Sequence, residues 1–347
     1  MYLIESDDSE ESHGRGGLDL EHESRDGQPG DTEQGDPQPP NDAWHGGALD
    51  AAGNCVGSGP GRRYGGAHPA PEDPLVATTE HHLLRLTKHH GLGNDFLVAL
   101  ADQNPDLQPD AARARAVCDR RSGVGADGLI LALAPSEPEN DACMVLLNAD
   151  GSEAEISGNG IRCLGQALLR HDGRSEGDLR IETAGGVREL RTVRGDADAE
   201  IWMQVDMGAA GDGPEPGPLT LGYGARRSAT REIGNPHLVL LVDDPARVDL
   251  AVDGPALEAE YPGGMNVHFV AVTGPDELSL AVWERGAGIT EACGSGATVA
   301  AAVANEWGLV GEHVSVVMPG GGAIVDITGT TLLLTGPAVF VAEVVVP

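Results

Sequence analysis

Short apolar segments recur along the chain from Leu83 onwards, and polar or glycine-rich turns separate them. Segments of this length that are rich in Val, Leu and Ile are typical of β-strands. The pattern predicts strands at residues 83–86, 96–100, 129–134, 144–147, 180–182, 187–193, 201–207, 237–242, 267–272, 278–284, 314–318, 323–327, 331–334 and 339–345.

Three further segments have the pattern of helices: residues 111–121, 161–170 and 297–307. Many strands with few helices favour the α+β class. Two of the helices follow similar motifs, because Ser157-Gly158-Asn159-Gly160 precedes one and Cys293-Gly294-Ser295-Gly296 precedes the other. Each motif comes after a strand and a loop, so the pair indicates an ancient duplication with one copy in each half of the chain.

The composition divides the chain into three parts. Residues 1–80 contain 17 acidic residues, 4 arginines and few aliphatic side chains. This segment cannot bury enough apolar surface to offset the cost of ordering, so we expect a disordered acidic tail at 1–82. The Gly/Pro-rich stretch 208–218 predicts a boundary between an N-terminal domain at 83–207 and a C-terminal domain at 208–336. We expect residues 337–347 to return to the N-terminal domain.

The net charge restricts the partners. A formal charge of -33 repels nucleic acid and anionic membranes. No apolar run of about 18 residues is present, so we expect no membrane span and a cytoplasmic protein.

The residue types also restrict the cofactors. Lys88 is the only lysine, and a pyridoxal phosphate enzyme needs a lysine for its Schiff base. No CxxC pair occurs, which argues against a zinc knuckle. Unless Lys88 holds pyridoxal phosphate, amino-acid chemistry here proceeds without it, and we expect neither an organic cofactor nor a metal.

The two glycine-containing motifs have the features of a site that binds a carboxylate. The first turn of a helix carries unpaired N–H groups and a partial positive charge, and glycine allows an anion to approach them closely. Two such turns that face each other would hold a carboxylate and lower the pKa of a thiol at either helix start. A proton-transferring residue on each side of the adjacent carbon would then give a racemase. The alternative is that both motifs are ordinary helix caps with glycines for tight turns.

The sequence resembles the diaminopimelate epimerase family. The resemblance extends from about Leu83 to the C-terminus. The blocks that carry it are His90-Gly91-Leu92-Gly93-Asn94-Asp95-Phe96, Asn148-Ala149-Asp150-Gly151-Ser152-Glu153, Gly158-Asn159-Gly160-Ile161-Arg162-Cys163, Gly234-Asn235-Pro236-His237, and Glu284-Arg285-Gly286-Ala287-Gly288 leading into Cys293-Gly294-Ser295-Gly296.

The resemblance implies a fold and a set of roles. The family fold has two pseudo-symmetric domains, each a curved mixed sheet around a central helix, and it often forms a homodimer. The implied catalytic group is Cys293 with Ser157, flanked by His237 and Glu284. The residues implied to grip the reacting carboxylate are Gly158, Asn159, Gly294 and Ser295, and those implied to bind the rest of the amino-acid substrate are Asn94, Asn148, Asn235, Asn266 and Arg285.

One catalytic position departs from the family pattern. The family has a second cysteine where this chain has Ser157, and a hydroxyl is a much weaker acid than a thiol. Ser157 could donate a proton with help from His237 or Glu155, but it should be a poor base. The chain is then a slow or directionally biased epimerase of LL- and meso-diaminopimelate, or it uses another group on that face. Otherwise it is a racemase or β-eliminating enzyme for another amino acid, or a catalytically silent amino-acid-binding protein.

We predict that Ser157→Cys raises the rate of epimerisation, because a thiol can be tuned to form a thiolate near neutral pH. Initial rates of the purified variant and of the parent protein on the same substrate measure the effect. A variant no faster than the parent would show that Ser157 does not limit the reaction.

Overall fold

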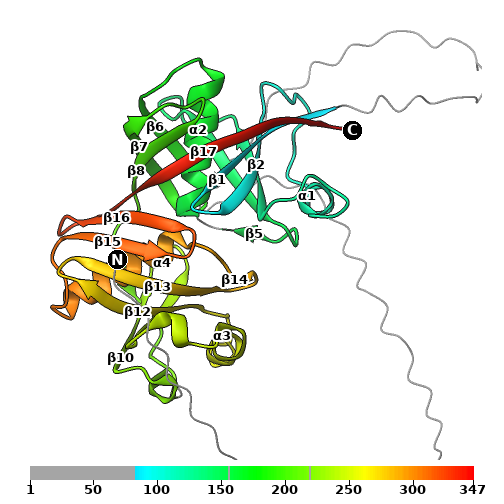
Figure 1. The fold of residues 1–347 in the computed structure, drawn as a ribbon. Coiled ribbons are helices and arrows are strands. Elements are labelled where there is room, and N and C mark those ends of the chain that lie inside the picture. Colours follow the sequence, from blue (N-terminus) through cyan, green and yellow to red (C-terminus); the bar gives the residue numbers. More distant parts are fainter. Residues whose placement is uncertain (1–82, 155–156, 219) are drawn as a thin grey trace, which may run out of the picture. The chain divides into compact units, whose positions relative to one another are not determined.

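The computed structural model describes residues 83–154, 157–218 and 220–347, and Figure 1 draws their elements. The predicted tail at 1–82 and the residue Glu155 lie outside the described residues. Among the helices of these described residues, none combines the length and the hydropathy that a membrane-spanning helix needs.

The first half, cyan to green in Figure 1, contains eight strands and two helices. Their bounds in chain order are β1 (Leu84–Gly91), β2 (Asn94–Leu100), α1 (Ala111–Cys118), β3 (Gly128–Leu133), β4 (Ala142–Asn148), β5 (Glu153–Ala154), α2 (Gly158–His171), β6 (Asp178–Thr183), β7 (Gly186–Gly195) and β8 (Glu200–Asp206).

The second half continues through yellow to red. Its elements are β9 (Gly211–Asp212), the 3-10 helix η1 (Thr220–Tyr223), β10 (Arg227–Glu232), β11 (Pro236–Leu241), the 3-10 helix η2 (Pro245–Arg247), α3 (Leu250–Glu258), β12 (Asn266–Gly274), β13 (Glu277–Glu284), β14 (Gly288–Ile289), α4 (Gly294–Glu306), β15 (His313–Met318), β16 (Gly321–Ile327) and β17 (Leu332–Val346).

The two halves repeat one topology. In the first, β1–β2 is antiparallel, β2–β3 parallel, β3–β4 antiparallel and β4–β6 parallel, and β6, β7 and β8 then form an antiparallel meander. In the second, β10–β11, β11–β12, β12–β13 and β13–β15 follow the same alternation, and β15, β16 and β17 form the meander. Helices α1 and α3 correspond, as do α2 and α4. This repetition confirms the α+β class with two pseudo-symmetric domains.

Strand β17 takes part in both halves. It pairs with β16 at its start, with β8 over Leu333–Val339, and with β1 over Val339–Val346. Figure 1 shows it as the long red strand that runs from β16 past α2 to β1. We propose domain boundaries at 83–207 and 208–336, with the last part of β17 belonging to the first domain.

The strands that lie between two helices bury both faces, one of them against the central helix α2 or α4. In β2, Phe96 and Val98 belong to the core shared with α2, whereas Leu97 and Ala99 pack with α1. In β11, Val239 faces the α4 side and its neighbour Leu240 packs with α3. Successive strand side chains point to opposite faces, so short apolar runs supply two cores at once.

The structure corrects the predicted helix starts. Helix α2 begins at Gly158 rather than Ile161, and α4 begins at Gly294 rather than Ala297. The motif glycines therefore form the first helical turn instead of preceding it. Helix α1 ends at Cys118, three residues before the predicted end.

Other differences concern continuity and missed elements. Residues 332–346 form one strand where two were predicted, because pairing with β8 carries the strand across Gly336-Pro337. Helix α3 was not predicted because Gly254-Pro255 is typical of a turn. Strand β10 was also missed, since its sequence Arg227–Glu232 is mostly polar.

The first turns of α2 and α4 rest on one buried side chain of β17. A methyl group at Gly158 or Gly294 would lie 2.8 or 3.0 Å from Leu334 Cδ2. We expect Leu334→Ala to lower the free energy of unfolding by about 2–5 kcal/mol, because it leaves a cavity beneath both helix starts.

Urea denaturation measures this loss, with Leu333→Ala as the matched control. Leu333 is the neighbouring, half-buried residue, so its truncation should cost clearly less. Equal losses in the two variants would contradict the packing role of Leu334.

Candidate active site

The two matched motifs form equivalent helix caps. Ser157 and Cys293 both have extended backbone conformations and precede the first helical residue. Ser157 Oγ accepts a hydrogen bond from Gly160 N at 3.0 Å, and Cys293 Sγ accepts one from Gly296 N at 3.3 Å. Each cap therefore satisfies one of the unpaired N–H groups at its helix start.

The starts of α2 and α4 meet at their first residues. A methyl group at Gly294 would lie only 3.0 Å from the Cα atom of Gly158, so the two glycines allow the backbones to come together. Asn159 links the two starts further, since its Nδ2 donates to the carbonyl of Ala292 at 3.1 Å. The structure thus brings the two motifs into contact, with Ser157 and Cys293 each one residue away from it.

Four amides at this junction lack partners. The N–H groups of Gly158, Asn159, Gly294 and Ser295 have no hydrogen-bond acceptor among the described residues, although all four residues are buried. Buried backbone donors are nearly always paired in proteins. Their concentration at two helix starts is typical of an anion site.

The thiol of Cys293 is enclosed beside a carboxyl group. Burial raises the pKa of Cys293 well above its ordinary value, and the nearby Glu284 raises it further, while hydrogen bonds from Ser295 and Gly296 oppose the shift. The prediction that the helix start lowers this pKa is therefore wrong for this arrangement. Desolvation and a like-signed neighbour outweigh the helix start, and Cys293 carries its proton at neutral pH.

Glu284 is perturbed in the same direction. The residue as a whole is half-buried, but its carboxyl group is enclosed, and this burial raises its pKa. Thr290 Oγ1 donates to Glu284 Oε1 at 2.6 Å, and Cys293 also hydrogen-bonds to the carboxyl group. Glu284 is thus placed to accept the proton of the thiol.

A buried pair of imidazoles lies on the same side. His237 Nε2 is 2.6 Å from Asn235 Oδ1, and His237 Nδ1 is 2.8 Å from His268 Nε2. With the Asn235 oxygen accepting, His237 carries its proton on Nε2 and receives a hydrogen bond from His268. Burial lowers the pKa of both rings, that of His268 to about 3, so both are neutral at pH 7. Both nitrogens of His237 are therefore engaged.

The three groups His237, His268 and Cys293 are the one cluster of possible metal ligands in the described residues, with ligand atoms within 4.8 Å of one another. The imidazole centroids are 5.0 Å apart and the facing nitrogens 2.8 Å apart, so the two rings point head-on at each other. A metal needs lone pairs that converge on one point, and these do not. The geometry favours a hydrogen-bonded pair over a metal centre.

Asn94 is oriented by a network of charged residues. Its Nδ2 donates to Asp127 Oδ2 at 2.8 Å, and its Oδ1 lies 3.3 Å from Asn159 Nδ2. Asp127 pairs with Arg120, which also pairs with Asp95. The sole lysine belongs to this network, because Lys88 Nζ is 2.8 Å from Asp95 Oδ2 and donates to the carbonyl of Gly125.

The remaining predicted residues differ in how directly they are connected to the other site residues. Asn266 pairs in register with His237, and its Oδ1 accepts from the backbone of Arg285 at 3.0 Å. The guanidinium of Arg285 is exposed and donates to Gly263. Asn148 is bound to Ser152 within its own turn, and no hydrogen bond joins its side chain to the other predicted site residues. Sequence analysis missed three residues whose side chains contact predicted site residues: Asp127 contacts Asn94, Arg162 contacts Asn159, and His268 contacts His237.

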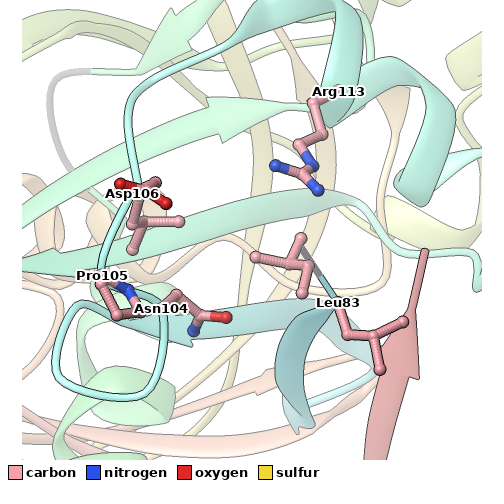
Figure 2. A pocket seen from close by; sticks show the side chains of 7 residues that line it. Leu83, Asn104, Pro105, Asp106 and Arg113 are labelled. Carbon is pink, nitrogen blue, oxygen red and sulfur yellow. The ribbon is translucent and has the colours of Figure 1, made fainter. Parts of the chain in front are cut away.

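One cavity of the structure lies away from these residues. Figure 2 shows this cavity of about 90 Å³, between the start of β1, the loop after β2 and α1. Its lining includes Leu83, Asn104 and Arg113 and none of the predicted site residues.

Comparison with known proteins places this arrangement in a family. The family model described as diaminopimelate epimerase matches residues 86–211 and 229–341, which is more than half of the chain. The chain belongs to the diaminopimelate epimerase family. A diaminopimelate epimerase of Rhodospirillum centenum is 39% identical over 73% of this chain and 89% of its own length. That of Pseudomonas entomophila is 39% identical over 75% of this chain and 98% of its own length.

Solved structures of other proteins share the fold of this chain. A hydroxyproline epimerase from Agrobacterium vitis has a TM-score of 0.58 at 19% identity and covers 77% of this chain and 93% of its own. A predicted epimerase from Pseudomonas aeruginosa has a TM-score of 0.59 at 19% identity over 76% of this chain and 99% of its own. The sequence relatives establish the family and that the chain is an isomerase, and the solved structures support the fold.

We expect Glu284→Gln to lower the pKa of the Cys293 thiol, because it removes a negative charge that disfavours the thiolate. Alkylation of Cys293 by iodoacetamide at about pH 8 should accelerate by roughly 10-fold or more, since one pKa unit is a tenfold change in thiolate. Mass spectrometry of the labelled peptide measures the rate.

Cys118 provides the internal control. Burial raises its pKa to about 11, and Glu284 is not among the groups that shift it. Its labelling should not change in Glu284→Gln. An unchanged rate at Cys293 would show that Glu284 does not act on the thiol.

Proposed function

We propose that this chain interconverts LL- and meso-diaminopimelate by moving the Cα proton, without a cofactor. Relatives named diaminopimelate epimerase, 39% identical over about three quarters of the chain, support the substrate. The observation that carries the proposal is the junction of α2 and α4, where four unpaired amides lie beside Cys293. Acidifying a Cα–H bond requires stabilisation of the charge that develops on the adjacent carboxylate, and unpaired amides supply it.

The carboxylate at the reacting carbon binds the amides of Gly158, Asn159, Gly294 and Ser295. They are the amides that Ser157 and Cys293 do not occupy, because each cap takes only the third N–H of its helix. Asn94, Asn148, Asn235, Asn266 and Arg285 bind the rest of the substrate. An Asn side chain offers both a donor and an acceptor, which suits an ammonium and a carboxylate on one carbon.

Cys293 transfers the proton on one face of Cα. As a neutral thiol it donates a proton to the carbanion-like carbon and becomes a thiolate. In the reverse direction the thiolate, formed when Glu284 takes the thiol proton, removes the Cα proton. The desolvated site makes the thiolate a stronger base than in water, because burial raises its pKa.

Ser157 transfers the proton on the other face and limits the rate. Each direction of epimerisation passes through both proton transfers, so a slow Ser157 step lowers kcat/KM by the same factor in both directions and leaves the equilibrium unchanged. A directional bias, one of the outcomes expected from the sequence, is therefore not part of this proposal. The two isomers differ instead in exchange with solvent. The isomer whose Cα–H faces Cys293 exchanges its proton faster than it inverts, because Cys293 can return a solvent-derived proton to the same face.

The cellular setting follows from the substrate. We place the reaction in the biosynthesis of lysine and of cell-wall peptidoglycan precursors, in the cytoplasm, with a homodimer as the working form. No pyridoxal phosphate takes part, and the ion pair of Lys88 with Asp95 supports this, because it engages the sole lysine. No nucleic acid or membrane partner is proposed.

Ser157 favours two alternatives. One is a racemase or β-eliminating enzyme that acts on another amino acid by one-base chemistry at Cys293. The other is a protein that binds an amino acid without catalysis.

We predict that the purified protein converts LL-diaminopimelate to the meso isomer in deuterated water and incorporates deuterium at Cα. One of the two isomers should incorporate deuterium faster than it inverts, since only the Cys293 face exchanges readily. Chiral chromatography and mass spectrometry measure both quantities in the same sample.

Cys293→Ala serves as the control and should abolish exchange. Absence of both exchange and meso product would eliminate the proposed activity. Binding by calorimetry without exchange would identify a silent binding protein, and exchange with another amino acid alone would identify a different racemase.

A further inference from the structure

A buried arginine lies one turn behind the start of α2. Arg162 has no exposed surface and is the largest fully buried side chain among the described residues. Its guanidinium donates to the carbonyl of Gly158 at 2.7 Å, to Asn159 Oδ1 at 2.6 Å and to the carbonyl of Pro337 at 3.2 Å. Every acceptor is an uncharged oxygen. Two of the acceptors belong to Gly158 and Asn159, whose backbone amides are unpaired.

Two glycines make room for this guanidinium. A methyl group at Gly336 of β17 would lie 3.0 Å from Arg162 Cζ, and one at Gly91 of β1 would lie 3.3 Å from an Arg162 Nη atom. The strands β1 and β17, from the two ends of the described chain, therefore both leave space for the guanidinium of Arg162. Such a close fit holds the guanidinium in a single orientation.

No carboxylate of the described residues forms an ion pair with this guanidinium. Within the described part of the chain Arg162 forms no ion pair, and burial lowers its pKa only to about 10, so it stays charged at neutral pH. Neither α2 nor α4 has an acidic residue in its first turn. The positive ends of the two helices and the buried guanidinium therefore lie close together. Because all three carry positive charge, they repel one another and raise the free energy of the folded state.

Two acidic groups of the surrounding networks, Glu284 and Asp95, have other partners. Glu284 interacts with Thr290 and Cys293, and Arg162 is not among the groups that shift its pKa. Asp95 pairs with Lys88 and Arg120. A buried cation without a counter-ion costs free energy, which an anion that binds at the adjacent amides would offset.

We propose that Arg162 is a positioning residue whose counter-ion is the carboxylate of the substrate at the reacting carbon. It orients Asn159 through Oδ1 and supplies a permanent positive charge behind the four unpaired amides. The charge stabilises the bound carboxylate, and stabilises it more as negative charge builds up when the Cα proton leaves. This inference rests on the proposed function, because it takes an α-amino carboxylate as the ligand.

Arg162→Gln and Arg162→Lys separate charge from hydrogen bonding. The first keeps donors and removes the charge, and the second keeps the charge and removes the planar fork. Arg170→Gln is the matched control, because it removes the same charge from the same helix, at a site paired with Asp198 and Glu343. For each protein we would measure kcat and KM for LL-diaminopimelate, and Tm with and without this ligand.

We expect Arg162→Gln to lower kcat/KM on the order of 10- to 100-fold, through kcat as well as KM. The rise in Tm that the ligand causes should fall by more than half. Arg162→Lys should keep more than half of that rise, and Arg170→Gln should keep all of it and its kcat/KM.

An Arg162→Gln protein with a lower ligand-free Tm but the full ligand-induced rise and an unchanged kcat/KM would overturn the proposal and leave a packing role. If Arg162→Gln does not fold, loss of the ligand-induced rise in Arg162→Lys overturns it. If the wild-type protein shows neither ligand-induced stabilisation nor Cα exchange, the proposed function itself fails, and this inference fails with it.

Discussion

The meeting of two helix starts is the constraint on which the rest of the structure depends. The positive ends of α2 and α4 lie in contact at Gly158 and Gly294, an arrangement that is electrostatically unfavourable without an anion. The fold enforces it through a strand shared by both halves. Leu334 of β17 packs under both helix starts, so the apolar core holds together two ends that would otherwise repel each other.

The backbone at this junction is nearly symmetric, but its electrostatics are not. Ser157 and Cys293 cap their helices in the same way. The enclosed carboxyl of Glu284 and the neutral pair of His237 and His268 both lie on the Cys293 side. One half of the duplicated fold thus carries the groups that shift the pKa of the Cys293 thiol. The other half has no such groups described beside Ser157, so the presence of a hydroxyl there instead of a thiol matters for the chemistry.

Much of the fold could be predicted because local patterns match long-range packing. Strands such as β2 and β12 have apolar residues on both faces, and both faces are covered, so their short apolar runs stand out. Helix α3 was missed because Gly254-Pro255 has the local preference of a turn, whereas in the structure the helix packs against β12, β13 and β14. The helix starts were predicted three residues late, since glycine disfavours a helix interior but is tolerated at a first turn with a side-chain cap.

The sequence by itself determined which groups were present: two capped glycine motifs, a cysteine in one and a serine in the other, a single lysine, and the blocks that identified the family. Only the tertiary structure decided which of them meet and how strongly they are desolvated. It raised the pKa of Cys293 where a helix start alone would lower it, and it buried Arg162 and His268, which have no local signal. Burial and the distance between charges depend on segments far apart in the chain, so no local pattern encodes them.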